Sequence, residues 1–521
     1  AQQFLKPSLA HLHDPFLLRN MDKGVSRLKK AKEHHEKVLV YGDYDVDGVT
    51  GTAVLSRFLK KFGVSVKTYI PHRMEEGYGL NYDIIPLAKA EGVTLLITVD
   101  CGITSSGEIE ELKRQGIDTI VIDHHEPENG QFPDAAIAVI DPKCPGCEYP
   151  FRDLAGVGLA AKFVQAVLGE FPEEELDLIT LGTIADVVPL LGEKRTIARF
   201  GLPFIGSSSK EGLKALLDLA RIKDKEMTPY SVGFVLGPRL NAAGRMGSAN
   251  TSLDLLLCDD LGAAYALAQS LDGYNKERQK LQTLIVEEAM DIIKKDAKIL
   301  ASPVIVVHKE GWHKGVLGIA ASKISDKYAR PAIVISMVDG LGVGSARSVE
   351  GFALHEALAH CSELLEEHGG HKRAAGLRVK NERIIEFSER INIFAEKILK
   401  DRDFTPILDI EYELPFAQAN WELIHILEDL GPHGEGNPQP LFATRRLMVK
   451  SRPQIMGRDT IKFWVTDGRV TLSAVGFGMA GEYEHLKMGQ AVDIVYTLGI
   501  DDWNKAPQVQ LMLKDIRVLT K

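Results

Sequence analysis

The sequence predicts an α/β protein of two lobes joined by a long helix and followed by a small β-barrel. Strand-like runs alternate with helical patterns from about residue 37 to 200 and again from about 303 to 398, as in sheets built from βαβ units. Between these regions, residues from about 252 to 300 keep apolar positions at helical spacing, and no Pro or Gly cluster breaks the second half. From about residue 402, short strand-like pieces alternate with turn residues, which indicates a barrel.

The composition limits the class of protein. A chain of 521 residues, with 45% hydrophobic and 26% charged residues, is long enough for about three domains and excludes global disorder. No apolar run is long enough to cross a bilayer, and the first residues lack the order of a signal peptide. With five scattered cysteines, we expect a reduced, cytoplasmic protein. The sequence leaves open whether residues precede Ala1.

Charge and cysteine spacing each allow two interpretations. The net charge of −10 disfavours simple phosphate binding, which depends on Lys and Arg, but a metal site built from Asp side chains would itself supply several of these charges.

Cys144 and Cys147 have the spacing of zinc ligands. No second CxxC or CxxH pair completes a tetrahedral site, so a plain loop is favoured.

The first predicted strand ends in three aspartates at every second position, Asp43, Asp45 and Asp47. In extended backbone these side chains share one face, so the carboxylates converge if the strand continues. Divalent cations are the usual counter-charge for such a group. The alternative is a solvated, Asp-rich turn that caps the following helix, and this segment alone favours neither interpretation.

Polar residues also follow the next strand-like runs. TLLITVD ends in Asp100, and DTIVID is followed by His124 and His125. Ligands of parallel sheets bind at the carboxyl ends of strands. Asp186 lies within the apolar run LDLITLGTIADVVPL, where a lone carboxylate is costly unless it is paired or bound to metal. Carboxylates and imidazoles suit manganese or magnesium, so this set predicts a two-metal hydrolase.

The C-terminal pieces fit a five-stranded oligonucleotide-binding (OB) fold as the simplest barrel. Trp464, Phe477 and Trp503 are candidates for base-stacking platforms in it. A position in the barrel core is the favoured interpretation for each ring.

Several motifs together resemble those of a known superfamily. The segments GDYDVDG, TVDCG, DHHEP and GTIADVVPL are similar, in this order, to the four motifs of the DHH phosphoesterases, and GGHKRAAGL is similar to the motif of the DHH-associated domain. The segments LGPRLNAAGRMGSA, GSARS, GPHGEGNPQPLF and AVGFGMA resemble the RecJ family within it, the exonucleases that digest single-stranded DNA from the 5′ end. The resemblance spans nearly the whole chain.

The resemblance implies roles for the acidic and histidine residues. Asp45 and Asp100 would bind a first metal ion, and Asp100 would bridge to a second one. The second ion would be bound by Asp47, Asp100, His124 and Asp186. His125 would contact the scissile phosphate, so Asp100, His124 and His125 form the expected catalytic set. The chain has Tyr41 where many members of the superfamily have a histidine ligand, and Asp43 is the expected substitute.

The resemblance also implies a site for substrate phosphates. The matching positions are Arg73, Arg245, Ser345, Arg347, Gly369, Gly370 and His371. An arginine cluster that holds a terminal 5′-phosphate explains the direction of digestion. Glycines allow backbone amides to approach a phosphate closely, although the Gly pair also fits the C-cap of a helix over CSELLEEHGG.

The resulting division of the chain has four parts. Residues 1–250 form a DHH catalytic domain with an N-terminal extension, and residues 251–300 form the connecting helix. Residues 301–400 form the DHH-associated substrate-binding domain, and residues 401–521 form the OB-fold domain. This layout predicts a cleft too narrow for duplex DNA.

The expected activity is two-metal hydrolysis of single-stranded DNA from its 5′ end with release of 5′-mononucleotides, in DNA repair and recombination, with Mn²⁺ or Mg²⁺. The expected partners are a single-strand-binding protein and a helicase, and the expected state is a monomer away from membranes. One alternative is a phosphodiesterase for oligoribonucleotides or cyclic dinucleotides, which would not need the barrel. The other is a non-catalytic scaffold of DNA replication, which would have lost the ligands.

Overall fold

The computed structural model describes residues 2–73, 75–127, 130–187, 189–400, 402, 404–405, 407–457, 459–501 and 506–519. The chain divides into two compact units. The larger unit comprises residues 13–186 and 200–406, and the smaller comprises residues 1–12, 187–199 and 407–521. Within the described part of the chain, no helix is both long enough and apolar enough to cross a membrane.

A five-stranded parallel sheet with the order β2-β1-β3-β4-β5 forms the centre of the first lobe of the larger unit. Its strands are β1 (Lys37–Gly42), β2 (Ser65–Tyr69), β3 (Val93–Val99), β4 (Asp118–Ile122) and β5 (Ala138–Ile140). Val38, Leu39 and Val40 are at most 1% exposed, as expected for a strand covered on both faces. The parallel βα architecture predicted from the alternating pattern is confirmed.

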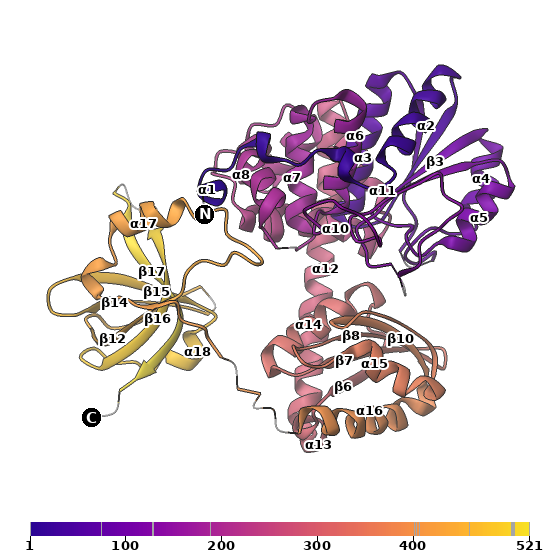
Figure 1. The fold of residues 1–521 in the computed structure, drawn as a ribbon. Helices are drawn as coiled ribbons and strands as arrows, with labels where there is room; N and C mark the ends of the chain where they lie inside the picture. The colour runs from indigo at the N-terminus through magenta and orange to yellow at the C-terminus, as the bar shows by residue number, and fades with distance from the viewer. Residues whose placement is uncertain are drawn as a thin grey trace. The chain divides into compact units, whose positions relative to one another are not determined.

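The helices of this lobe connect the strands and extend the lobe beyond the sheet (Figure 1). They are α2 (Met21–Glu33), α3 (Val46–Phe62), α4 (Ile84–Ala90), α5 (Ser106–Arg114), α6 (Gly156–Leu168), α7 (Leu176–Ala185), α9 (Glu211–Leu219), α10 (Gly237–Met246) and α11 (Asn250–Leu257). A π-helix, η5 (Ser231–Leu236), runs directly into α10. Helix α3 packs on β1 and against α6 and α7, which places its first turn at the carboxyl end of β1.

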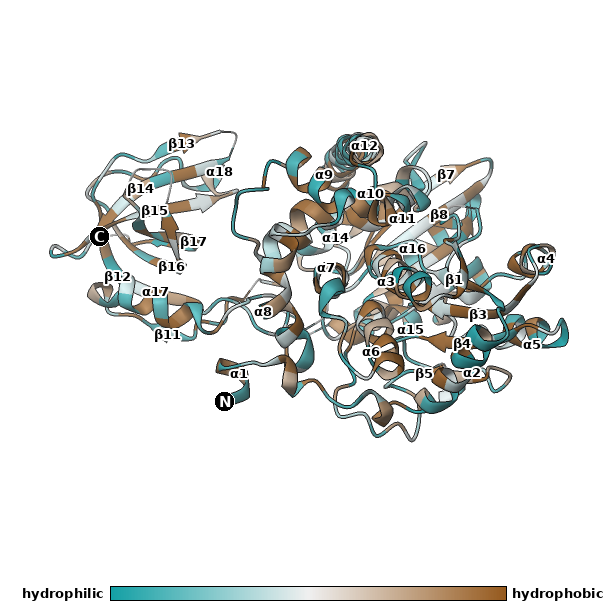
Figure 2. Cartoon of the chain, turned by 90° about the horizontal axis from the view of Figure 1, so that it is seen from above, coloured by the Kyte–Doolittle hydropathy of each residue, from teal (hydrophilic) through white to brown (hydrophobic). Residues whose placement is uncertain are grey.

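The predicted long helix is α12 (Leu261–Lys295), with 35 residues. It packs against α9, α10 and α11 of the first lobe and against α14 (Leu317–Tyr328) of the second (Figures 1 and 2). The buried positions Ala264, Ala268 and Leu271, and further on Ile285 and Ala289, recur at helical spacing. One helix therefore contributes to both lobes.

The second lobe has a mixed sheet with the order β6-β7-β8-β10-β9. Its elements are β6 (Ile305–Glu310), β7 (Ala332–Val338), β8 (Leu341–Arg347), α15 (Leu354–His360), β9 (Leu365–Gly370), β10 (Ala374–Lys380) and α16 (Ile384–Leu399). Strands β6 and β7 are parallel, and the other pairs are antiparallel. Residues 365–370 form a strand, so the helix C-cap considered for Gly369 and Gly370 is wrong.

A closed barrel lies in the smaller unit. Its strands are β12 (Phe442–Val449), β14 (Thr460–Thr466), β15 (Thr471–Phe477), β16 (Ala491–Asp501) and β17 (Gln508–Val518). The sheet runs β12-β16-β17-β15-β14, and pairing of β12 with β14 closes it. The predicted barrel is confirmed. The strand-like segment near residue 410 is shorter than its pattern suggests, because only β11 (Tyr412–Glu413) pairs there.

Arg195 holds distant segments of the smaller unit together. Its side chain is 2% exposed and donates hydrogen bonds to the carbonyl oxygens of Phe4 at 3.0 Å, Leu430 at 2.8 Å and Asp429 at 3.0 Å. The helices α1 (Gln2–Leu5) and α17 (Trp421–Glu428) flank these carbonyls. A buried guanidinium that satisfies three carbonyls links the N-terminal residues to the segment before the barrel.

Replacing Arg195 with Ala should destabilise the smaller unit by about 3 kcal/mol, because three carbonyl oxygens lose a buried, charged donor. Limited proteolysis with mass spectrometry should show faster cleavage within residues 2–12 and 429–437. The exposed Arg199→Ala is the matched control. Equal cleavage in the two variants would contradict a structural role for Arg195.

Candidate metal and nucleic-acid site

The three aspartates lie where β1 ends and α3 begins. Asp43 and Asp45 are in the connecting loop, and Asp47 is in the first turn of α3. Strand geometry stops at Gly42, so the expected alternation along an extended strand does not continue through Asp43, Asp45 and Asp47. Instead, Asp45 is the N-cap of α3, and its Oδ1 accepts hydrogen bonds from the amides of Asp47 at 2.9 Å and Gly48 at 3.2 Å. The capping turn and the acidic cluster therefore coexist in one loop.

Asp47 is held by the N-terminus of α6. The amide of Gly156 donates to Asp47 Oδ2 at 2.6 Å, and the amide of Val157 donates to Oδ1 at 2.7 Å. Burial and the charge of Asp45 raise the pKa of Asp47 to about 7, although the two amides favour its charged form. The N-terminus of α6 thus fixes this carboxylate in one orientation.

Asp100 follows β3 with a positive φ of 65°, which turns its side chain out of the strand. The residue is 3% exposed, and its Oδ1 lies 3.0 Å from His124 Nε2. Burial, followed by the charges of Asp47 and Asp45, raises the pKa of Asp100 well above its ordinary value. Gly156 packs tightly here, since a Cβ atom on it would lie 2.7 Å from the Asp100 Cβ.

Asp123, the first residue of the DHH segment, organises the two histidines. Its Oδ1 accepts from the amides of His124 at 2.7 Å and His125 at 3.2 Å and lies 2.7 Å from His125 Nδ1. Its Oδ2 accepts from the amide of Ile103 at 2.9 Å. The sequence pattern located Asp123 at the end of a strand but indicated no role for it. Its position directly before the two histidines was the only feature of the sequence that pointed to one.

The structure brings the predicted acidic and histidine residues together at the carboxyl ends of β1, β3 and β4. Three sets have ligand atoms within 4.8 Å of one another. They are Asp43, Asp45 and Asp100; Asp47, His124 and Asp186; and Asp100, His124 and His125. Asp100 and His124 each belong to two sets, so the sets share residues and form one cluster.

The donor set fits divalent metal ions. Asp43 Oδ1 is buried and accepts no hydrogen bond from the described residues. Burial and the charge of Asp45 raise the pKa of Asp43 well above its ordinary value. A hard cation supplies the positive charge that such buried carboxylate oxygens need, and oxygen and imidazole donors suit Mn²⁺ or Mg²⁺.

Tyr78 is a neighbour of the cluster that sequence reasoning missed. Its hydroxyl lies 3.0 Å from His125 Nδ1 and 3.4 Å from the Asp100 carbonyl oxygen. Positive φ angles at Gly77 (81°) and Gly79 (92°) shape the loop that presents it. Burial lowers the pKa of His125, but the hydrogen bond and charge of Asp123 outweigh it and raise the pKa to about 9.

A cluster of arginines adjoins the carboxylates. Burial, then the charges of Arg73, Arg278 and Arg347, lowers the pKa of Arg245 to about 9, whereas Asp45 raises it. The guanidinium of Arg73 stacks over the Tyr44 ring at 4.7 Å. The predicted residues Arg73, Arg245 and Arg347 therefore lie close together. Sequence patterns did not predict Arg278 of α12 as a member of this cluster, because in the sequence it resembles any other polar residue on the outer face of a helix.

The remaining predicted residues lie on the sheet of the second lobe. Arg347 Nη1 donates to Ser345 Oγ at 3.3 Å on β8. Ser345 pairs with Gly376 of β10, and Gly376 pairs with Gly369 of β9, so Ser345 and Gly369 lie in one row across the sheet. Gly370 is the last residue of β9, and His371 begins the exposed turn between β9 and β10.

The barrel presents two of the three candidate aromatic rings to solvent. Trp464 on β14 is 37% exposed and Phe477 on β15 is 67% exposed, so the favoured interpretation as core residues is wrong for both. Alternation along each strand places them on the outer face. Trp503 lies outside the described residues.

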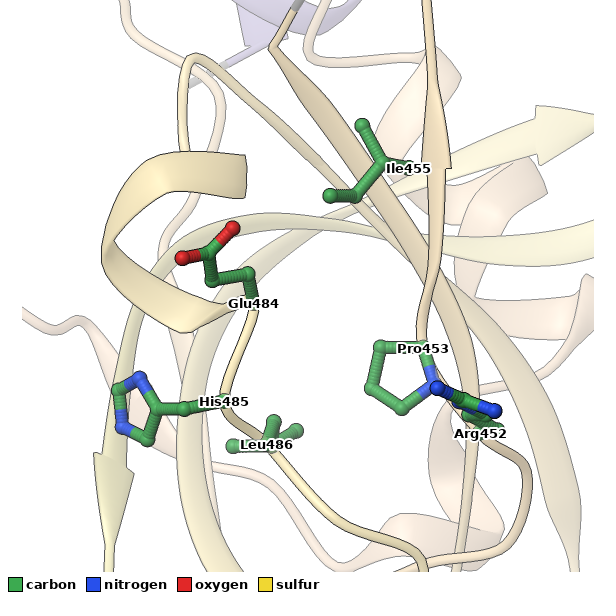
Figure 3. Close-up of a pocket in the computed structure, with 6 residues that line it drawn as sticks. All are labelled: Arg452, Pro453, Ile455, Glu484, His485 and Leu486. Atoms are coloured by element: carbon green, nitrogen blue, oxygen red, sulfur yellow. The ribbon is translucent and has the colours of Figure 1, made fainter.

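Two further features do not belong to the cluster. A pocket of about 470 Å³ on the barrel is lined by Arg452, Pro453, Ile455, Glu484, His485 and Leu486 (Figure 3). It contains none of the predicted site residues. Cys144 and Cys147 lie in a turn after β5 and are free thiols, in agreement with the plain loop predicted there.

Comparisons with known proteins agree with this architecture. Residues 37–183 match the DHH family N-terminal domain, residues 296–397 match the DHHA1 domain and residues 410–515 match the RecJ OB domain. The single-stranded-DNA-specific exonuclease RecJ of Salmonella typhimurium is 33% identical over 96% of this chain and 90% of its own length. The chain belongs to the RecJ family.

Other members of the RecJ family support the assignment. RecJ of Bacillus subtilis is 39% identical over 99% of this chain, which spans 66% of that protein's length. Crystal structures of RecJ from Thermus thermophilus in complex with Mn²⁺ and with Mg²⁺ cover all of this chain, with TM-scores of 0.85 at 30% identity and 0.79 at 28% identity. This chain covers 74% and 73% of those two chains.

Replacing Gly156 with Ala should weaken Mn²⁺ binding about tenfold, because the new Cβ atom displaces Asp100 and the amide that orients Asp47. Titration calorimetry with MnCl₂ measures the affinity. Gly158→Ala is the matched control, since a Cβ atom there would meet the Leu154 side chain, with the nearest atom, a methyl carbon, at 3.3 Å. Equal affinity in both variants would show that the packing of Gly156 on Asp100 does not support metal binding.

Proposed function

We propose that this chain is a metal-dependent exonuclease that hydrolyses single-stranded DNA from its 5′ end and releases 5′-mononucleotides. Membership of the RecJ family supports the reaction class, since relatives named single-stranded-DNA-specific exonucleases match nearly the whole chain. The observation that carries the proposal is the meeting of a carboxylate and histidine cluster with an arginine cluster in one unit.

The acidic cluster holds two metal ions, Mn²⁺ or Mg²⁺. Asp45 and Asp100, with Asp43 in place of the missing histidine, hold the first ion. Asp47, Asp100, His124 and Asp186 hold the second. When bound, the ions activate water and neutralise charge on the phosphate. Support comes from the short distances within the cluster and from the metal complexes of the related RecJ structures.

A ring N–H of His125 donates a hydrogen bond to the scissile phosphate. Asp123 orients the ring through Nδ1, and the Tyr78 hydroxyl lies 3.0 Å from the same nitrogen. Against the effect of burial, the hydrogen bond and the charge of Asp123 raise the pKa of His125 and so favour the protonated ring, which can contact a phosphate oxygen. Asp123 and Tyr78 therefore both contact the His125 ring.

The arginine cluster holds the terminal 5′-phosphate. Burial, then the charges of neighbouring arginines, lowers the pKa of Arg245 and of Arg347, and Arg73 is among those neighbours of both. An anion between the three guanidinium groups removes this repulsion. Ser345 adds a hydroxyl donor beside Arg347. Gly369 and Gly370 at the end of β9, with the His371 side chain after them, contact a phosphate further along the strand. Anchoring of the 5′ end at this position sets the direction of digestion.

The chain works as four parts: residues 1–250 for catalysis, residues 251–300 as connector, residues 301–400 for substrate binding, and residues 401–521 for nucleic-acid binding. Single-stranded DNA with a 5′ end is the substrate, delivered by a single-strand-binding protein and a helicase to a monomeric enzyme in the cytoplasm. Free, unpaired thiols at the described cysteines support a reducing compartment.

Digestion of a single-stranded DNA with a 5′-phosphate and a 3′ label tests the reaction and its direction. With Mn²⁺ we expect products that shorten from the 5′ end, and no products with chelator or with Asp100→Ala. The exposed Asp153→Ala is the control. Rapid digestion of a blunt duplex would contradict strand selectivity, and turnover of cyclic dinucleotides alone would favour the small-substrate alternative.

Replacing Arg347 with Gln should reduce kcat/KM for 5′-phosphorylated DNA about tenfold or more, because a charged hydrogen bond to phosphate is lost. The same change should have little effect on 5′-hydroxyl DNA, so the preference for phosphate falls. Arg378→Gln, an exposed arginine on β10 of the same lobe, is the control. An unchanged ratio of the two substrates would exclude Arg347 from the 5′-phosphate site.

A further inference from the structure

Two large aromatic rings, Tyr230 and Phe234, are stacked on the surface at the start of η5. Their side chains are 65% and 71% exposed, and their ring centroids lie 5.0 Å apart with an interplanar angle of 21°. Val232 and Leu236 of the same turn are buried, so the helix already has an apolar face directed inward. The aromatic pair therefore is not needed for the core.

The backbone at this pair is unusual. Residues 231–236 form a π-helix between the short helical start at residues 229–230 and α10. Such segments are rare and occur frequently at functional sites. Apolar surface exposed to water costs free energy, and covering it with a partner recovers that cost. This arrangement therefore suggests a ligand rather than a packing role.

The aromatic pair lies on the same helix face as residues of the candidate site. Phe234 and Arg245 are 11 residues apart in a continuous helical segment, which is close to three full turns, so both side chains lie on one face. Asn241 lies on that face as well, and its Oδ1 accepts from the amide of Val46 at 3.1 Å, at the start of α3. The helix thus leads from the aromatic pair to the acidic loop.

We propose that Tyr230 and Phe234 form a base-stacking platform for the substrate strand, about 16 Å along the helix from Arg245. This inference rests on the proposed function. A strand whose terminal phosphate lies at the arginine cluster passes the platform a few nucleotides further on. Aromatic faces bind every base without sequence preference, and they interact with unstacked bases rather than with a duplex.

The test measures hydrolysis and binding with the full chain. Tyr230→Ala/Phe234→Ala should raise KM for a long 5′-phosphorylated single strand at least fivefold, from the loss of about 1 kcal/mol or more of stacking. A dinucleotide that does not reach the platform should be cleaved at the wild-type rate. Phe234→Trp, which keeps a stacking surface, should retain most of the affinity. Phe16→Ala is the control, since Phe16 is an exposed ring at 52% on η2 (Pro15–Leu17).

A second substrate distinguishes stacking from an indirect effect. A long strand with abasic sites at the third to eighth nucleotides should bind the wild-type protein as weakly as the intact strand binds the double variant. The double variant should show no further loss with the abasic strand, because the two changes remove the same contact. Additive losses would overturn the inference.

Binding to fluorescent single-stranded DNA without metal, measured by anisotropy, separates the platform from the reaction. If the wild-type protein hydrolyses no DNA but the double variant binds the strand at least fivefold more weakly, the reaction fails and the platform stands. If hydrolysis is normal and the double variant shows wild-type KM and affinity, the platform is wrong and the rings are a surface for a protein partner.

Discussion

Mutual repulsion among buried carboxylates at the carboxyl end of the first sheet is the constraint on which the site depends. Asp43, Asp47 and Asp100 are almost completely buried, and burial together with neighbouring negative charge raises the pKa of each. Amides at the start of α6 offset part of this cost at Asp47. A protein retains such a cluster when bound cations complete it, so the fold around the cluster is arranged for metal rather than for its own stability.

The arginine cluster beside the carboxylates has the opposite problem, which is repulsion between positive charges. Arg245 is buried near three other arginines, and its pKa is lowered by that burial and by their charges. In the proposed function, a nucleic-acid end would resolve both problems together, because its phosphates would neutralise the arginines while metal ions would neutralise the carboxylates and the phosphate. The net charge of −10 is therefore compatible with DNA binding, since the charges that matter are local.

Helices position the acidic cluster and the arginine cluster relative to each other. Helix α3 begins at the acidic loop, α6 binds Asp47 through its first amides, and α10 carries Arg245 while Asn241 contacts the start of α3. Helix α12 packs on both lobes and contributes Arg278. Because these elements are rigid and their contacts are short, a small change such as a methyl group at Gly156 is transmitted directly to the carboxylates.

Sequence patterns by themselves determined the parallel sheet, the long helix, the closed barrel and the set of residues that meet in the acidic cluster, because periodicity and strand-end position are local properties. They did not determine that Asp123 would orient His125, that Tyr78 and Arg278 would join the site, or that Gly156 would contact Asp100. Each of these depends on a contact between residues far apart in the sequence. Only the tertiary structure showed that Trp464 and Phe477 are exposed. The same holds for the stacked pair of Tyr230 and Phe234. A sequence pattern does not distinguish an aromatic residue that the fold buries from one that it leaves in solvent.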